Sequence, residues 1–120
     1  MLPETLKKSR SKITLKGIPA SNGIGKGCPI IIENPLSPEN ECAKENFVLV
    51  VPYATPQLTL LMIKASAIVT EKGGIVSHAA IIAREMGIPC VVNVESCLEK
   101  LRNVNFVLVD GNKGVVYGYY

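Results

Sequence analysis

The sequence predicts a mixed α/β domain, and three features predict it. Short runs rich in β-branched residues, such as Phe47–Val51 and Ala67–Thr70, have the length of buried strands. One segment, His78–Met86, carries helix signals at both of its ends. The 120 residues are 48% hydrophobic and 19% charged, a composition typical of a single domain with a core rather than of a disordered chain.

In the first half of the chain, the composition changes near residues 11–13, where basic residues give way to alternating apolar ones. We therefore expect a flexible basic tail over residues 1–12 and a folded domain over residues 13–120. The expected elements are, in order, a strand at 13–16, a glycine-rich passage at 17–27 leading into an apolar strand that ends near Ile32, a loop at 34–40 and the strand Phe47–Val51.

The second half alternates helices and strands. The expected elements are a helix at 56–64, the strand Ala67–Thr70, the helix His78–Met86, a strand at 89–94, a short helix at 95–101, and strands at 105–109 and Val115–Tyr119. Ser77 is a suitable N-cap for the central helix, and Gly87 suits the left-handed position that ends it. Asp110 and Gly111 predict a hairpin turn rather than a metal site.

Composition and cysteine spacing disfavour several functions. The net charge of +3 lies largely in the tail, and with two Phe and no Trp we expect no nucleic-acid binding. No apolar stretch approaches the roughly 20 residues of a membrane span, and no apolar segment follows the basic start as in a signal peptide. The four cysteines form no C-x-x-C pair, so we expect no metal site, and a cytoplasmic location, although counting alone leaves two disulfides open.

His78 is the candidate catalytic residue. As the first residue of a capped helix, it lies beside backbone N–H groups that lack partners within the helix, and that position suits an anion such as a phosphoryl group. The same helix dipole disfavours the charged imidazolium, and a neutral ring is a nucleophile that can act as a covalent relay. A lone histidine is more often structural or superficial, so position alone leaves catalysis the minority interpretation.

The residues around His78 complete the candidate site. We expect Ser77, Gly73, Gly74 and Ala79 to support the phosphate, since the glycines leave space for a donor and Ser77 caps the helix or offers its hydroxyl. A helical wheel places Ala79, Ile82, Ala83 and Met86 on the buried face. On the exposed flank we expect partner docking at Ile81, Arg84 and Glu85, with a surface ion pair as the alternative for Arg84 and an isolated surface side chain as the alternative for Ile81.

Residues 73–89, which read GGIVSHAAIIAREMGIP, resemble the signature of the mobile phosphohistidine domain in phosphoenolpyruvate synthase, pyruvate phosphate dikinase and the sugar phosphotransferase enzyme I. The resemblance extends to residues 17–23 near the start and 109–117 near the end. It implies a three-layer β/β/α swivelling domain in which His78 is phosphorylated at one active site and delivers the group at another. This chain differs from the usual pattern of the family it resembles at three positions. Val76 stands where the family commonly has Thr, and Asn93 and Val104 stand where it commonly has Gly.

The same resemblance implies partners. Relatives take phosphate from an ATP-grasp nucleotide-binding domain and exchange it with pyruvate on a TIM-barrel domain that uses magnesium. Neither is encoded here, so we expect them as separate chains that bind ATP or phosphoenolpyruvate with magnesium. We expect this chain to bind no cofactor itself. By itself it would be an incomplete enzyme, one component of a split phosphotransferase. Two alternatives stay open: a non-catalytic module that regulates a partner, and the small swivelling subunit of an aconitase-like hydro-lyase.

Overall fold

The computed structural model describes residues 12–37 and 46–120, whose strands form an eight-stranded mixed sheet in the order β1-β8-β7-β3-β4-β5-β6-β2. The elements in chain order are β1 (Lys12–Lys16), β2 (Ile18–Ser21), β3 (Ile24–Ile31), β4 (Phe47–Val51), the 3-10 helix η1 (Pro56–Leu58), α2 (Thr59–Lys64), β5 (Ala67–Thr70), α3 (His78–Met86), β6 (Cys90–Val92), α4 (Cys97–Lys100), β7 (Phe106–Asp110) and β8 (Val115–Tyr119).

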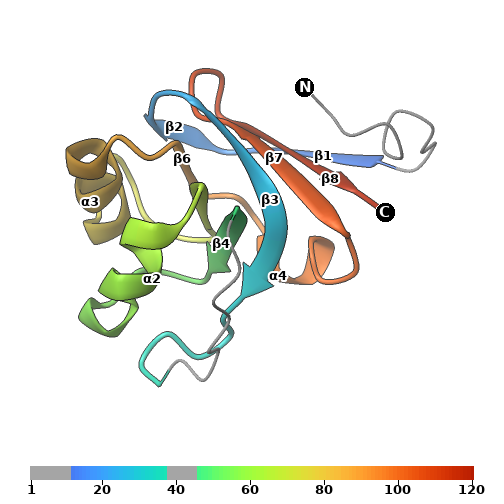
Figure 1. The fold of residues 1–120 in the computed structure, drawn as a ribbon. Coiled ribbons are helices and arrows are strands. Elements are labelled where there is room, and N and C mark those ends of the chain that lie inside the picture. Colours follow the sequence, from blue (N-terminus) through green and yellow to red (C-terminus); the bar gives the residue numbers. More distant parts are fainter. Residues whose placement is uncertain (1–11, 38–45) are drawn as a thin grey trace.

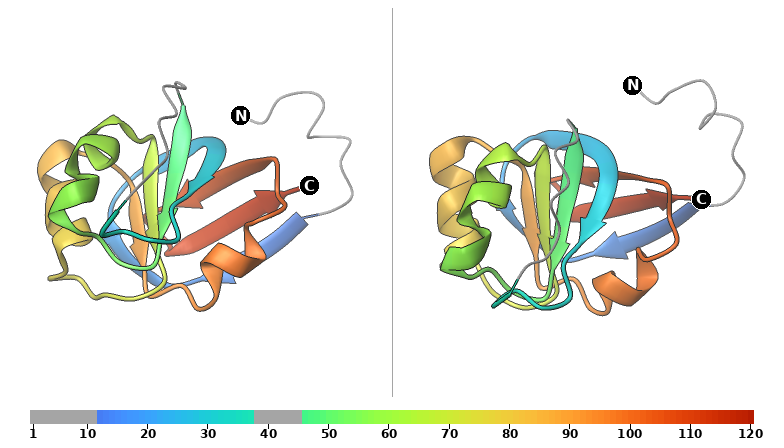
Figure 2. Two further views of the ribbon diagram at one scale, coloured as in Figure 1. Left: turned by 90° about the horizontal axis from the view of Figure 1, so that it is seen from below. Right: turned by 60° about the horizontal axis from the view of Figure 1, so that its bottom comes forward.

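Strand β3 folds the sheet into two layers. Its residues 24–27 pair antiparallel with β7, whereas residues 28–31 pair parallel with β4. The first layer is the antiparallel set β1, β8 and β7, and the second contains β4, β5, β6 and β2 (Figure 1). Helices α2 and α3 cover the far side of the second layer, as both views of Figure 2 show. The predicted three-layer β/β/α architecture is confirmed.

Strand β4 lies at the centre of both cores, and all five of its residues are buried. Phe47, Leu49 and Val51 face the helices, while Val48 and Val50 face the other sheet. Because a strand covered on both faces needs apolar side chains at every position, it reads as a continuous hydrophobic run. Full burial of each such side chain contributes about 1.5–3 kcal/mol.

Glycines make the bend in β3 possible. A Cβ at Gly25 would collide with the carbonyl oxygen of Ser66, and one at Gly27 would collide with that of Asn46. The two layers therefore approach each other at backbone distance where β3 crosses between them. The interpretation of this glycine-rich passage as turn and strand residues, rather than as a phosphate-binding loop, is consistent with these contacts.

Strand β2 was not predicted from the sequence, and several helix and strand ends differ from the predicted ones. Strand β2 contains Pro19, and it lies at the sheet edge, where a missing N–H is tolerated. Strand β6 and helix α4 are shorter than predicted because Asn93 and Ser96 adopt φ values of 57° and 56° between them. The expected ability of Asn93 to take a positive φ in place of glycine is thus confirmed. The predicted helix at 56–64 begins as a 3-10 turn.

The predictions made for the start of the chain and for the turn near its end have different outcomes. The predicted basic tail lies outside the described residues except Lys12, which opens β1 opposite Tyr119 and so is not part of a tail. The predicted hairpin turn at Asp110 and Gly111 does join β7 to β8. Within residues 12–37 and 46–120, no helix is long and apolar enough to cross a membrane.

Candidate functional site

His78 is the first residue of α3 and its side chain is exposed. Ser77 precedes it in an extended conformation, with φ −69° and ψ 162°, and its Oγ accepts a hydrogen bond of 3.4 Å from the N–H of Ala80. The predicted N-cap is confirmed. By helix geometry, the N–H groups of His78 and Ala79 have no acceptor within the helix, so they remain at its positive end beside the imidazole.

The segment between β5 and α3 is held by backbone and side-chain hydrogen bonds. The N–H of Glu71 donates to the carbonyl of Val51 at 3.1 Å, and that of Lys72 donates to the carbonyl of Pro52 at 2.9 Å. Thr70 is fully buried, and its Oγ1 donates to the carbonyl of Lys72 at 2.7 Å. These bonds continue the parallel pairing of β4 and β5 beyond the strand ends, so the chain enters the histidine loop, which we define as residues 71–77, from a fixed position.

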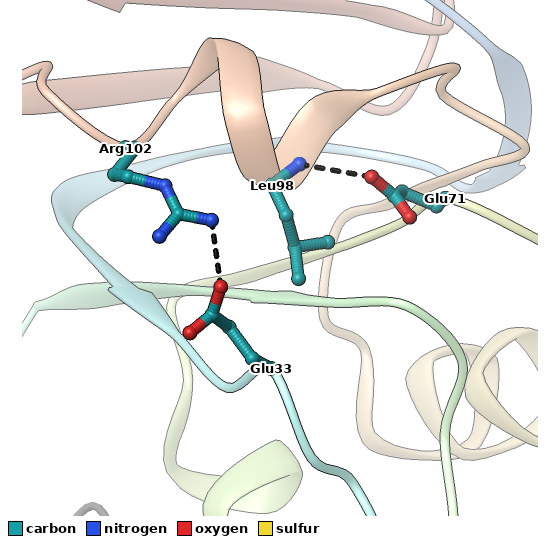
Figure 3. A network of polar contacts seen from close by, with 4 residues as sticks. All are labelled: Glu33, Glu71, Leu98 and Arg102. Carbon is teal, nitrogen blue, oxygen red and sulfur yellow. Dashed lines mark hydrogen bonds and ion pairs between the residues drawn. The ribbon is translucent and has the colours of Figure 1, made fainter.

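Glu71 adds a second anchor, which the sequence did not reveal. Its Oε2 accepts the N–H of Leu98 at 3.2 Å, joining the start of the loop to the first turn of α4 (Figure 3). No local pattern in the sequence indicates this bond, because its donor, the N–H of Leu98, reaches Glu71 only through the packing of α4. Figure 3 also shows the neighbouring ion pair, in which a guanidinium nitrogen of Arg102 lies 2.6 Å from Oε1 of Glu33 and both side chains are exposed.

The two loop glycines differ in what they do. Gly73 has φ +116°, and a Cβ there would lie 3.2 Å from both Cβ and Oγ of Ser77. Gly74 does not have a positive φ, and a Cβ there would meet nothing within 4 Å. The expected special backbone conformation therefore applies to Gly73, whereas Gly74 leaves open space in front of the helix start.

Small side chains seat α3 on the sheet. Ala79, Ala80 and Ala83 are at most 1% exposed and pack in the core against the second layer. One wheel assignment is wrong, because Met86 is 52% exposed rather than inward. Ala80, which the wheel did not include in the buried face, is fully buried. The face of α3 that carries the alanines packs on the sheet, because small side chains allow the closest approach of the helix. Since the Ala79 side chain is buried, support for a phosphate from this residue would come from its backbone N–H.

The carboxyl end of α3 is fixed as the sequence indicated. Gly87 adopts the left-handed conformation, with φ 69°, and its N–H contacts the carbonyls of Ala83 and Arg84. Arg84 donates from its guanidinium to the carbonyl of Ala20 at 3.1 Å, which ties the helix to β2. This bond to a backbone carbonyl replaces the surface ion pair considered for Arg84. Its side chain and that of Glu85 are exposed.

Three apolar residues close to His78 in the sequence are exposed. Val76 is 79% exposed, Ile75 is 56% exposed and Ile81 is 42% exposed. The predicted exposure of Ile81 is confirmed. Exposed apolar side chains that gather on one surface are typical of a contact with another macromolecule.

The buried cysteines take no part in this surface. Burial raises the pKa of Cys90 to about 12, although the nearby Arg84 opposes the rise. Burial also raises the pKa of Cys97 to about 12, and the charge of Glu71 adds to it. Cys28 is exposed and unbridged, while Cys42 lies outside the described residues. Within the part of the chain that the structure describes, no three His, Cys, Asp or Glu side chains gather as a metal site.

The family model for the PEP-utilising enzyme mobile domain matches residues 43–114, which include the histidine loop and α3. The chain belongs to this family. The mobile domain is 45% identical over 112 residues to a probable phosphoenolpyruvate synthase of Staphylothermus marinus, an alignment that covers 93% of the chain and 13% of that protein. It is 43% identical over 107 residues to the phosphoenolpyruvate synthase of Pyrococcus furiosus, covering 89% of the chain and again 13% of the relative.

Solved structures support the same fold. The mobile domain superposes with a TM-score of 0.54 on an enzyme I structure at 31% identity, covering 63% of the domain and 31% of that chain. It also superposes on Thermococcus kodakaraensis aconitase X with a TM-score of 0.66, covering 90% of the domain and 98% of that chain. At 19% identity, the second likeness concerns the fold alone.

Proposed function

We propose that the mobile domain is a phosphoryl carrier, transiently phosphorylated on His78. The observation that carries the proposal is the exposed imidazole at the first position of α3, in a chain of the PEP-utilising mobile-domain family. A ring nitrogen attacks phosphorus, an N–P bond forms, and the donor's P–O bond breaks with its electron pair leaving on the donor oxygen. In the second half-reaction, an acceptor oxygen attacks the same phosphorus and the imidazole leaves.

The amino end of α3 supports the phosphorylated state. The phosphoryl group brings a charge of about −1.5 to −2, and the helix end stabilises such a charge by roughly 0.3–1 kcal/mol at an exposed site. The N–H groups of His78 and Ala79 are the donors available there, because that of Ala80 is bonded to Ser77. Ser77 thus acts mainly by fixing the helix start, and Gly74 keeps the approach to the ring open.

The donor and acceptor sites would lie outside this domain. The domain spans 13% of its synthase relatives, so the remaining chemistry belongs to other domains or chains. We propose a nucleotide-binding ATP-grasp unit and a phosphoenolpyruvate- and pyruvate-binding TIM-barrel unit, which bind ATP or phosphoenolpyruvate with magnesium. Ile75, Val76 and Ile81 would contact these units around the histidine, with Arg84 and Glu85 at the edge of the contact.

Labelling tests the proposal. The protein is incubated with phosphoenolpyruvate or with ATP, together with a phosphoenolpyruvate synthase as the partner enzyme, and its intact mass is measured. We expect a gain of about 80 Da, the mass of one added phosphoryl group, that is stable to alkali and lost in acid. The gain should disappear in His78→Ala and persist in Ser77→Ala, which separates the two neighbouring nucleophiles.

Three results would contradict the carrier function. They are a label that persists in His78→Ala, a label that survives acid, and no label with either donor. Together with binding to the synthase that survives His78→Ala, the last result would favour a non-catalytic binding module. Co-purification with an iron-sulfur large subunit would instead favour the hydro-lyase alternative, for which the likeness to aconitase X provides a matching fold.

A further inference from the structure

A cleft of about 310 Å³ opens between strand β2 and the carboxyl end of α3. Clefts of about this volume bind small molecules. Arg84, on the helix side of the cleft, follows His78 by six residues, which corresponds to about 9 Å along the helix axis. The cleft is therefore a different surface from the candidate phosphoryl site. It is lined by the end of β2, the residue after it and two residues of the helix end, namely Pro19, Ala20, Ser21, Asn22, Arg84 and Gly87.

A β-bulge in β2 forms one wall of the cleft. Pro19 and Ser21 pair with two adjacent residues of β6, so Ala20 between them is an extra residue without a partner in the ladder. Bulges disturb the ladder locally and are common beside binding sites. The carbonyl of Ala20 accepts a hydrogen bond of 3.1 Å from the guanidinium of Arg84. The bulge thus fixes the position of a cationic side chain at the cleft.

The charge of Arg84 is not offset by its surroundings. A guanidinium has five N–H donors, and the bond to Ala20 uses one of them. Arg84 forms no ion pair with a carboxylate of residues 12–37 and 46–120. Arg84 lies close enough to Cys90 to lower its pKa, but burial has the larger effect and raises that pKa to about 12, so this thiol is neutral at pH 7. The other donors and the full positive charge of Arg84 therefore remain for a ligand.

The carboxyl end of α3 does not cancel this charge. A helix end of this kind carries about half a negative charge, which is less than the full charge of a guanidinium. Two of the last carbonyls, those of Ala83 and Arg84, already accept the N–H of Gly87. A Cβ at Gly87 would meet nothing within 4 Å, so the helix end leaves open space on its side of the cleft.

Ser21 supplies a second polar group. It lines the cleft and is only 7% exposed. Its hydroxyl makes no hydrogen bond within the part of the chain that the structure describes. Among the same residues, no side-chain oxygen is fully enclosed without a partner, so the hydroxyl of Ser21 is open to the cleft. A nearly buried hydroxyl without a protein partner favours a ligand that can accept its hydrogen bond.

We propose that this cleft binds the oxyanion of a small molecule, which is a phosphate or a carboxylate group. The guanidinium of Arg84 donates to two of its oxygens at once, an arrangement that suits the planar fork of this side chain. The hydroxyl of Ser21 donates to one of the same oxygens. Pro19 and Ala20 provide apolar surface for the rest of the ligand. The site is independent of phosphoryl transfer on His78.

Amide chemical shifts of the labelled protein test the site with three probes at fixed ionic strength: inorganic phosphate, propionate and uncharged propionamide. We expect the anions to shift the amides of residues 20–22 and 84–87 until the site is saturated, and propionamide to leave them unchanged. The anion that saturates at the lower concentration identifies the oxyanion class. Arg84→Gln should weaken binding roughly tenfold or more, because it removes hydrogen bonds between charged groups. Arg102→Gln removes the same charge at another exposed arginine and should bind like the parent.

Ser21→Ala tests the site without changing any charge. Because the hydroxyl of Ser21 has no partner in the described part of the protein, its removal should leave the free energy of unfolding unchanged or raise it. The same variant should weaken binding of the anion a few-fold. A purely structural hydroxyl would give the opposite pattern, with lower stability in urea titration and unchanged binding.

Four results would overturn the proposal. They are equal binding of propionamide and propionate, equal losses in Arg84→Gln and Arg102→Gln, shifts confined to other surfaces, and no saturation with either anion. Binding should persist in His78→Ala, so failure of this site and failure of the carrier function are distinguishable.

Discussion

Replacing Gly73 with alanine tests whether backbone geometry holds the loop before His78. The φ of +116° at Gly73 is a conformation that residues with a Cβ rarely adopt, and such strain costs about 1–3 kcal/mol. The new Cβ would also lie 3.2 Å from the Cβ and Oγ of Ser77, so the capping side chain must shift. Loss of the cap adds up to about 1 kcal/mol. We therefore expect the free energy of unfolding to fall by roughly 1–4 kcal/mol.

Gly74→Ala is the matched control, since it makes the same substitution one residue later. Its Cβ would meet nothing within 4 Å and its φ is not positive, so alanine should leave stability unchanged or raise it by about 0.4–1 kcal/mol through the unfolded state. Urea unfolding measures both variants, and phosphoryl labelling of His78 reports whether the site survives. Equal stabilities for the two variants would refute the assignment of separate roles to these glycines.

Three further changes test other parts of the site. Ser77→Ala should lower the free energy of unfolding by about 0.5–1 kcal/mol. This is the low end of the range for N-cap substitutions, because the capping bond from the N–H of Ala80 is long at 3.4 Å. An unchanged free energy in urea titration would contradict the cap. Glu71→Ala should cost roughly 1 kcal/mol by removing the acceptor at α4, and thermal unfolding with no shift would show that the bond contributes nothing. The pKa values of Cys90 and Cys97 are raised from an ordinary 9.0 to about 12, so above pH 9 the unfolded chain loses these protons while the folded chain keeps them. The free energy of unfolding should therefore be unaffected below pH 9 and then fall by about 1.4 kcal/mol per pH unit for each thiol up to pH 12. Urea titrations between pH 9 and 10.5 should give a shallower fall in Cys97→Ala, and parallel slopes would contradict these pKa values.

Local chemistry in the sequence determined the central part of the site. A serine that can accept a backbone N–H, a run of alanines and isoleucines, and a glycine that tolerates positive φ specified α3 at both ends, and the structure has that helix at the predicted residues. The strands β4, β5 and β8 also have their predicted bounds: β4 and β5 are short, fully buried runs, and β8 follows the Asp110–Gly111 turn signal. These features depend on neighbours within a few residues.

Features that depend on distant partners were decided only by tertiary packing. Glu71 looks like any loop charge until α4 places the N–H of Leu98 beside it. Met86 is exposed although the helical wheel places it inward, because the sheet, rather than the helix's own periodicity, selects which face of α3 packs closest. Strand β2 was hidden by Pro19, which is tolerated only because β2 lies at the sheet edge.

The antiparallel layer belongs to the same category, because residues far apart in the sequence become neighbours there only when β3 pairs with β7 and β1 with β8. The sequence by itself determined where His78 stands on its helix, because a cap and a helix start are local. The fold decided what supports that helix and what lies behind it, because register and layer packing join residues that no local pattern connects.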